Sequence, residues 1–286
     1  MIEMKLPIKL VSMSAAAVIL WGAGFSTAPA TEPCGDFDAC TVLIEVNSSD
    51  GDIGFHWLGD AGDLRSMRID DPNGAKVFEN KASGALRAQK LTETFGESAE
   101  PLCWPDPDAE PEDLDEIVTL RDFREQWEPG TYTFTGKGEE GEMLSGETEL
   151  TYNLPAAPQD LDFSGNVISW VAGNDLGNCA PLAGGVGQET IAEVLDIIAD
   201  PALVPVASYE VVLEPDVADG DPIGSLKYTI RVPGDTFAVE VPALYLASLP
   251  DDTPVKIEVG AIGVDDNGTF TEEDGFCVNE DEGCED

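Results

Sequence analysis

Residues 154–163, LPAAPQDLDF, followed by VISW at residues 167–170, decide the fold. Prolines bound the start of this stretch, and the runs after it alternate apolar and polar residues as far as VKIEVGAIGV at residues 255–264. Alternation places every second side chain on one face of a strand, and short strands separated by Gly- and Pro-rich breaks are typical of β-sandwiches. The chain is therefore predicted to be all-β.

The first 30 residues have the pattern of a secretion signal. Lys5 and Lys9 precede an apolar stretch over residues 10–20, and APA at residues 28–30 fits the small-x-small rule for cleavage. The apolar stretch is shorter than the ~20 residues that a membrane span needs. We expect a signal peptide over residues 1–30 and a secreted or periplasmic protein without membrane insertion after cleavage. A retained anchor is the alternative.

The charge balance is strongly acidic. The 57 Asp and Glu residues against 14 Lys and Arg give a formal net charge of -43. Such a surface repels phosphate, so nucleic acids and anionic membranes are poor partners. The charge fits solubility in a salty exterior, where counterions screen the repulsion, or specific binding of cations or of a basic partner.

The first half is predicted to be a β-sandwich domain over residues 31–153. TVLIEV at residues 41–46 and IGFHW at residues 53–57 form a hairpin, and two further strands over 64–69 and 75–79 join through the turn at 71–74. Thr119 is the expected N-cap of a short helix that ends before Pro129. Two more strands follow, in GTYTFTGKG (130–138) and SGETELTYNL (145–154). The inward side chains are predicted to be Val42, Ile44, Val46, Ile53, Phe55, Trp57, Tyr132, Phe134, Leu150 and Tyr152.

The second half, from about residue 155 to 278, resembles a fibronectin type III domain. VISW supplies the core tryptophan at Trp170, and SYEVVLE (208–214), LKYTIRV (226–232) and FAVEVP (237–242) continue the strand series. LPDDTPVKIEVGAIG at residues 249–263 is similar to the corner of the family, with Val255 where the corner tyrosine belongs. The resemblance implies a sandwich domain over residues 155–286 that ends in an acidic, Cys-containing tail.

A long insertion over residues 173–205 separates the second and third strands of this domain. Within it, Ile191, Leu195 and Ile198 recur at helical spacing and Pro201 follows as a stop, which predicts a helix. Its apolar stripe is expected either to pack on its own sandwich or to act as a recognition element or a wedge at the domain interface. The first half also resembles uncharacterised exported bacterial proteins, through LTETFGESAEP (91–101) and PGTYTFTG (129–136).

The six cysteines are expected to pair, because exported proteins with an even number of cysteines form disulfides. Three fall in each half: Cys34, Cys40, Cys103, Cys179, Cys277 and Cys284. Odd numbers in both halves require at least one bridge across the boundary. The type III resemblance places Cys179 toward the first domain, with Cys103 as its natural partner, and leaves the two closely spaced pairs for local bridges. A zinc site is disfavoured because the chain lacks C-x-x-C and has one histidine.

Catalytic motifs are missing from the sequence. His56 lies between Phe55 and Trp57 in a strand, which favours a structural role over a general base. No nucleophile elbow, H-E-x-x-H motif or glycine-rich phosphate loop occurs. We assign no catalytic residue, although paired carboxylates of a glycosidase stay open because acidic residues are so numerous.

Calcium is the one cofactor that the sequence leaves open. Asp50, Asp52, Asp265, Asp266 and Asn267 cluster oxygen donors in turns, which suits a hard cation, but none of the turns has EF-hand spacing. Ordinary turn chemistry is the competing interpretation.

The sequence as a whole predicts an exported binding or adhesion-type protein with an unknown protein or glycan partner. Two alternatives remain: a secreted hydrolase, for example a carbohydrate-active one, with the type III domain as a spacer, and a structural subunit of a surface or matrix. An enzyme should have a concave acidic cleft with facing carboxylates.

Overall fold

The computed structural model describes residues 34–103, 117–179, 196–218 and 220–278. Its strands are β1 (Ala39–Asn47), β2 (Asp52–Asp70), β3 (Lys76–Lys81), β4 (Leu91–Glu97), β5 (Gly130–Gly138), β6 (Met143–Leu150), β7 (Gln159–Ser164), β8 (Val167–Val171), β9 (Val206–Pro215), β10 (Tyr228–Pro233), β11 (Ala238–Glu240), β12 (Thr253–Gly263) and β13 (Gly268–Val278). Its helices are α1 (Gly84–Gln89), α2 (Leu120–Gln126) and α4 (Ala243–Leu246), with short 3-10 helices η2 (Gly177–Cys179), η3 (Pro201–Leu203) and η4 (Pro222–Ser225). Every helix in these ranges is too short or too polar to cross a bilayer.

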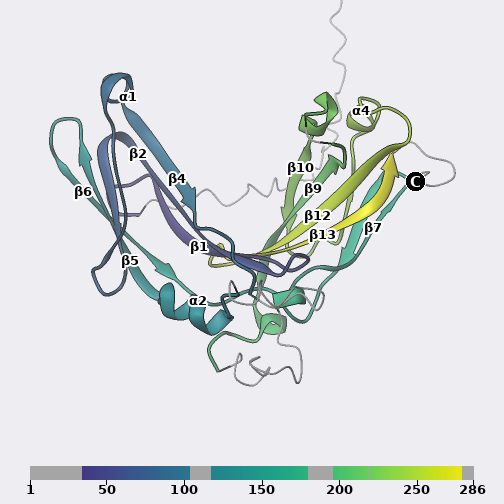
Figure 1. The fold of residues 1–286 in the computed structure, drawn as a ribbon, viewed down its shortest axis with the longest axis horizontal. Helices are drawn as coiled ribbons and strands as arrows, with labels where there is room; N and C mark the ends of the chain where they lie inside the picture. The colour runs from purple at the N-terminus through teal and green to yellow at the C-terminus, as the bar shows by residue number, and fades with distance from the viewer. Residues whose placement is uncertain (1–33, 104–116, 180–195, 219, 279–286) are drawn as a thin grey trace, which may run out of the picture.

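One continuous sheet runs through both halves of the molecule. Its strand order is β10-β9-β12-β13-β1-β2-β5-β6, and β3 and β4 also pair with β2. The other three strands form a separate sheet in the order β11-β8-β7. The large sheet is bent into a V, with β2 and β4 in one arm, β9 and β10 in the other, and β1 beside β13 between them (Figure 1). The all-β sandwich class predicted from the sequence is confirmed.

The two halves join where β1 runs parallel to β13. The parallel register extends from Glu45 opposite Gly268 to Asn47 opposite Phe270. Buried Asn267 fastens this joint, because its Oδ1 accepts from the Ile44 amide at 2.8 Å and its Nδ2 donates to the Thr151 carbonyl at 3.1 Å. The two halves therefore share backbone hydrogen bonds, and the division into domains at residues 153–155 stays a prediction.

The C-terminal half is a sandwich of three strands against four. β7, β8 and β11 cover β9, β10, β12 and β13, the arrangement that the type III resemblance implies (Figure 1). Trp170 lies in its core with its ring edge-on to Tyr209, at a centroid distance of 5.3 Å. The predicted inward residues of β9 and β12, including Val255 at the corner, are buried. Instead of a tyrosine, Thr253 holds the corner by donating its hydroxyl to the Pro250 carbonyl at 2.8 Å.

The N-terminal half builds its core around one long strand. Residues 52–60 of β2 pair with β1 and residues 66–70 pair with β3 and β5, with register irregularities between the two segments. The sequence predicts two separate strands here, over residues 53–57 and 64–69; the chain instead continues as one bent strand. α1 and β4 are elements that the sequence reading missed.

Helix α2 covers one end of this core, as Figure 1 shows. The predicted N-cap is present: the Thr119 side chain accepts from the Asp122 amide, while Leu120 and Phe123 are buried. Just past the helix, the Trp127 ring stacks on Phe55 with centroids 4.1 Å apart. The predicted inward residues are buried, except for Trp57, which is half-buried.

Two disulfides are fully described. Cys34 is bonded to Cys40, and Cys103 to Cys179, with Cα separations of 5.8 and 5.5 Å. Cys277 is also disulfide-bonded, but its partner lies outside the described residues, as does Cys284. The Cys103–Cys179 bridge links the first half to the insertion of the second, which is the cross-boundary bridge expected from cysteine parity.

The described ends of the insertion pack on the first half. Leu176, Cys179 and Ile198 belong to the core of the N-terminal half, not to that of the sandwich that carries them. These contacts favour the role of interface wedge over packing on its own sandwich. The helix predicted from Ile191 to Ile198 falls mostly on residues outside the described ranges.

Candidate binding site on the concave face

The inner face of the V collects charged side chains from both arms. Leu43 and Glu45 alternate with the buried residues of β1, so they lie on the opposite face. His56 pairs across with Leu43 and with Glu97 of β4, which puts these three on the same face. In the other arm, Glu210 alternates with buried residues of β9 in the same way.

A pocket of about 320 Å³ lies at the base of the V. Its charged or titratable lining consists of Glu45, His56, Glu97, Glu210, Arg231 and Asp266. Arg231 donates to Glu210 at 2.6 Å, so the one cation of the lining is already paired. The pocket therefore has more negative than positive charge within it.

Aromatic rings form much of the remaining wall. Phe95 is 77% exposed, which is unusual for a large apolar side chain, and Trp57 and Phe270 line the same pocket. Glycine makes room for two of these rings: a Cβ on Gly96 would overlap the Trp57 ring, and one on Gly260 would overlap Phe270. The sequence thus places flat aromatic surface and carboxylates side by side.

Burial and neighbouring carboxylates both disfavour the ionised form of Glu45. Burial raises the pKa of Glu45 to about 7, with further contributions from Glu100, Glu210 and Glu97. Burial likewise raises the pKa of Asp52 to about 6, again with Glu100 contributing. Burial penalises the ionised form of both carboxyls, and the neighbouring carboxylates add to that penalty.

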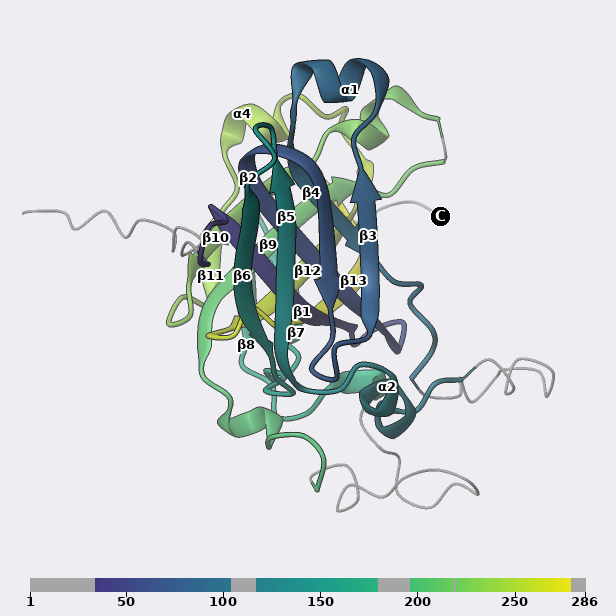
Figure 2. The same ribbon diagram turned by 90° about the vertical axis from the view of Figure 1, so that its left-hand side faces the viewer.

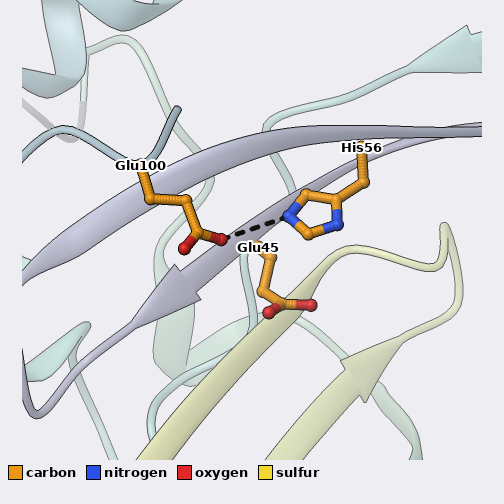
Figure 3. Close-up of side chains that lie close together, drawn as sticks. All are labelled: Glu45, His56 and Glu100. Atoms are coloured by element: carbon orange, nitrogen blue, oxygen red, sulfur yellow. Dashed lines mark ion pairs between the residues drawn. The ribbon is translucent and has the colours of Figure 1, made fainter. Parts of the chain in front are cut away.

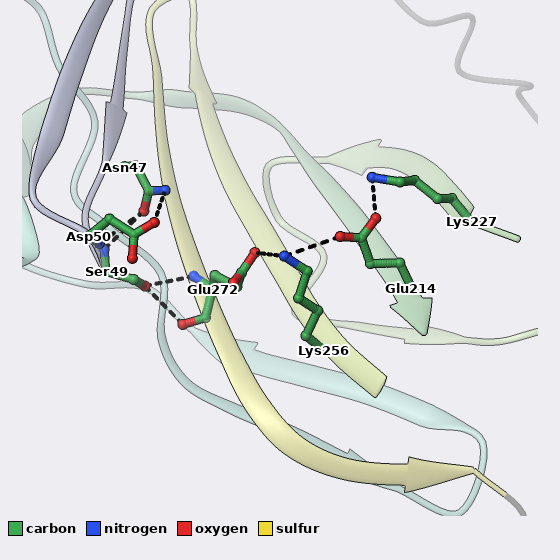
Figure 4. A network of polar contacts seen from close by, with 7 residues as sticks. All are labelled: Asn47, Ser49, Asp50, Glu214, Lys227, Lys256 and Glu272. Atoms are coloured by element: carbon green, nitrogen blue, oxygen red, sulfur yellow. Dashed lines mark hydrogen bonds and ion pairs between the residues drawn. The ribbon is translucent and has the colours of Figure 1, made fainter. Parts of the chain in front are cut away.

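A few residues farther along the same face, carboxylates are compensated. Lys256 lies 2.7 Å from Glu272 and 3.2 Å from Glu214, and Lys227 also contacts Glu214 (Figure 4). Burial would raise the pKa of Glu214, but the two lysines lower it overall. Glu258, which faces the same cluster without a lysine partner among the described residues, has its pKa raised to about 7, mainly by burial and then by Glu272.

Glu45, His56 and Glu100 could hold a metal ion. One ligand atom from each lies within 4.8 Å of the others, and His56 Nε2 is 3.5 Å from Glu100 Oε1 (Figure 3). His56 Nε2 is also buried without a hydrogen-bond partner in the described structure. One imidazole and two carboxylates suit a divalent transition metal better than calcium, which prefers oxygen ligands alone.

Of the five residues proposed for calcium, Asp266 lines the concave pocket, and the other four lie outside its lining. Asp50 accepts from the Asn47 side chain in the turn before β2, and Asp52 begins that strand. Asp265 accepts from Thr151 and Asn153 across the joint between the halves. Among the described residues, none of the four aspartates joins a group of three Asp, Glu, His or Cys ligands. Calcium binding by these turns stays a prediction.

The acidic residues of this face are not among those predicted from the sequence. The alternation of TVLIEV and SYEVVLE predicts the buried residues, and the same alternation assigns Glu45 and Glu210 to the opposite face. That signal was available, but the pairing of β1 with β13, which brings the two glutamates near each other, is a contact between residues more than 200 apart in the chain.

Comparisons with known proteins leave the family open. No protein-family model and no curated protein matches this chain. The resemblance of the first half to exported bacterial proteins therefore stays a prediction.

Solved structures give distant likenesses. The fibronectin(III)-like modules of CbhA from Clostridium thermocellum are 8% identical, over 82% of this chain and 90% of theirs, with a TM-score of 0.26. A 1.5-MDa bacterial ice-binding adhesin is 10% identical, over 87% of this chain and 65% of that structure, with a TM-score of 0.22. The BSP domain of a biofilm associated protein is 11% identical, over 85% of this chain and 30% of that structure, with a TM-score of 0.21. At these values the type III character of the C-terminal half rests on its own strand order.

Proposed function

We propose that this is an exported binding protein whose concave face binds basic side chains of a partner protein. The disulfides support export, because such bridges persist in oxidising compartments outside the cytoplasm. We place the protein in the periplasm or the extracellular space on this ground and on that of its N-terminal signal pattern.

The observation that carries the proposal is the excess of carboxylates around exposed aromatic surface in one pocket. Glu45 comes from β1 between the arms, Glu97 from β4 in one arm and Glu210 from β9 in the other, while Arg231 is paired with Glu210. A lysine or arginine side chain entering the pocket would supply the missing positive charge and lie against the exposed ring of Phe95. Cation–π contacts of this kind contribute about 0.5–2 kcal/mol, and the surrounding acidic field would raise the association rate of a basic partner.

The test uses spermidine and tetralysine as probes, because both present spaced ammonium groups. We expect saturable binding by calorimetry, weakened about tenfold by Glu45→Gln together with Glu97→Gln, and weakened by Phe95→Ala. Glu140→Gln with Glu147→Gln is the matched control, since it removes the same two charges from exposed positions away from the pocket. Equal losses in both double variants would reduce the binding to nonspecific charge attraction and would refute the proposal.

A second candidate is acid–base hydrolysis of a glycan. A glutamate with a pKa of about 7 beside other carboxylates resembles the acid partner of a glycosidase pair, and the pocket has the concave acidic form expected of such an enzyme. Release of reducing ends from neutral polysaccharides, abolished by Glu45→Gln and unaffected by Glu147→Gln, would favour it. Absence of release from any polysaccharide, with spermidine binding intact, leaves the binding function.

A further inference from the structure

A second pocket on the outer face of the N-terminal half has the opposite charge. It has a volume of about 550 Å³ and is lined by Arg65, Ser66, Glu79, Asn80, Lys81, Ala82, Arg87 and Lys137. These residues belong to β2, β3, β5 and α1, except for Ala82, which lies between β3 and α1. The four elements lie close together in Figure 2. Four of the 14 basic residues of the chain therefore surround one pocket in a protein whose net charge is -43.

Strand register brings two of these cations to either side of Ser66. Ser66 pairs directly with Lys81 of β3 on one side and with Lys137 of β5 on the other. Residues directly opposite each other in antiparallel strands share a face, with Cβ atoms about 5 Å apart. The neighbouring residue Met67 is buried in the core, so the row of Ser66, Lys81 and Lys137 faces outward.

An irregularity in β2 adds the third cation. Leu64 pairs with Gly138 and Ser66 with Lys137, so β2 has one residue more than β5 at this point, and that extra residue is Arg65. Bulges of this kind redirect a side chain that would otherwise face the other side of the sheet, and Arg65 lines the same pocket as Ser66. Arg87, in the last turn of α1, completes the set.

These four side chains differ from the other cations of the described structure in having no partner there. The side chains of Arg65, Lys81, Arg87 and Lys137 make no ion pair, hydrogen bond or ring contact with any described residue. The others are paired: Arg68 with Asp70, Lys76 with Glu79, Lys90 with Asp63 and Glu139, Lys227 with Glu214, Arg231 with Glu210, Lys256 with Glu214 and Glu272, while Arg124 lies over the Tyr152 ring and Arg121 has a partner of its own. Acidic residues are about four times as numerous as basic ones in this chain, so most basic side chains are expected to have an acidic partner. Four unpaired cations around one pocket are therefore a candidate site for an anionic ligand.

We propose that this pocket binds a small multivalent oxyanion, a phosphate or sulfate group, free or carried on a sugar. Two guanidinium groups provide the fork of donors that oxyanions accept in bidentate fashion, and two ammonium groups add point charges. Ser66 supplies a neutral hydroxyl beside them, whereas the Asn80 side chain of the lining is already hydrogen-bonded to Met67 and Thr94. Glu79, the one carboxylate of the lining, lies 2.7 Å from Lys76, which offsets its charge.

The overall negative charge restricts the ligand but does not exclude it. At physiological salt the Debye length is about 8 Å, so the distant carboxylates are screened while the four cations act at contact distance. A long polyanion would extend over the acidic surface around the pocket and be repelled. A compact ligand fits both the local positive charge and the global negative charge.

The test is calorimetric titration at constant ionic strength with sodium chloride, inorganic sulfate and pyrophosphate, and with glucose 6-sulfate and glucose 6-phosphate against unmodified glucose. We expect saturable binding of pyrophosphate, tighter than that of sulfate, and none of chloride. Tighter binding of the sugar esters than of the free anions would identify the carrier as a glycan, and the reverse order would identify a free anion as the ligand. Failure of all four oxyanions to bind above the chloride background would overturn the proposal.

Variants locate the site. Arg65→Gln with Arg87→Gln should weaken pyrophosphate binding at least about tenfold, whereas Lys227→Gln, which removes a paired and exposed cation of the C-terminal half, should leave it within about twofold. Lys137→Gln, at an exposed position, provides a second variant if the double arginine variant melts at a lower temperature than the wild type. Equal weakening by Lys227→Gln and Lys137→Gln would show that the binding follows net charge and would refute the assignment of the pocket.

Discussion

Two regions of the concave face differ in whether their buried carboxylates have a cation partner. Around Lys256, the lysine lies between Glu214 and Glu272 and compensates both. Around Glu45, no lysine or arginine lies in the lining except Arg231, which is committed to Glu210. Ion pairs hold the carboxylates of the first region, whereas in the second region burial and neighbouring carboxylates penalise the ionised form of Glu45, a penalty that a bound cation would reduce.

Lowering the pH should protonate the buried carboxylates that lack a cation partner and so stabilise the folded protein. The folded-state pKa values of Glu45 and Glu258, about 7, and of Asp52, about 6, lie above their ordinary values, so the native state binds protons more tightly than the unfolded state. The stabilisation is present below about pH 4 and is lost as the pH rises through 7. We expect the free energy of unfolding to be about 3–5 kcal/mol higher at pH 5 than at pH 8, with allowance for partial exposure and coupling.

Urea unfolding at pH 5 and pH 8 measures this difference, and added sodium chloride should reduce it by screening. A protein more stable at pH 8 than at pH 5 in low salt would show that the uncompensated carboxylates do not dominate the balance.

Removing Lys256 should leave Glu214 and Glu272 with less neutralising charge, so that the region around them resembles the region around Glu45. Lys256→Met keeps the apolar stem but leaves Glu272 without its 2.7 Å partner, so we expect a loss of about 2 kcal/mol at pH 8. Lys227→Gln is the control: Lys227 contacts the same Glu214, but its side chain is 57% exposed, so its loss should cost under about 1 kcal/mol. Equal costs for the two variants would remove the distinction between the regions.

Neutralising Glu45 should have the opposite sign. Glu45→Gln retains the shape but removes the buried charge, so we expect a gain of about 1–2 kcal/mol at pH 8 and little change at pH 5, where the native Glu45 is already protonated. Glu147→Gln on β6 removes an exposed charge and should change stability by under about 0.5 kcal/mol at either pH. A destabilised Glu45→Gln protein at pH 8 would mean that Glu45 has a favourable partner.

Features set by local sequence patterns could be predicted, whereas features set by contacts between distant residues could not. The strand alternation correctly predicts buried residues such as Val211 and Val259, because the alternation within a strand is local. The sequence also predicts the capped helix at Thr119, from its capping residues, and a disulfide between the halves, from the odd number of cysteines in each half. The bend of β2 and the parallel joint between β1 and β13 depend on distant contacts that no local pattern encodes.

The candidate sites depend on those distant contacts. The acidic pocket requires β1 and β13 to lie side by side, and the basic pocket requires the irregularity at Arg65. The calcium turns were the sites that local composition favoured, whereas the concentrated charge lies on the faces of strands.

The most direct test of the account is the titration of Glu45 itself. Carboxyl-carbon NMR, with the Glu45 resonance assigned from Glu45→Gln, should give a pKa of about 7 in the free protein. Saturation with spermidine should lower it, because a bound cation favours the ionised carboxylate. A Glu45 pKa near the ordinary value of about 4.3 in the free protein, or one that spermidine leaves unchanged, would contradict the claim that the concave pocket holds uncompensated charge for a basic ligand.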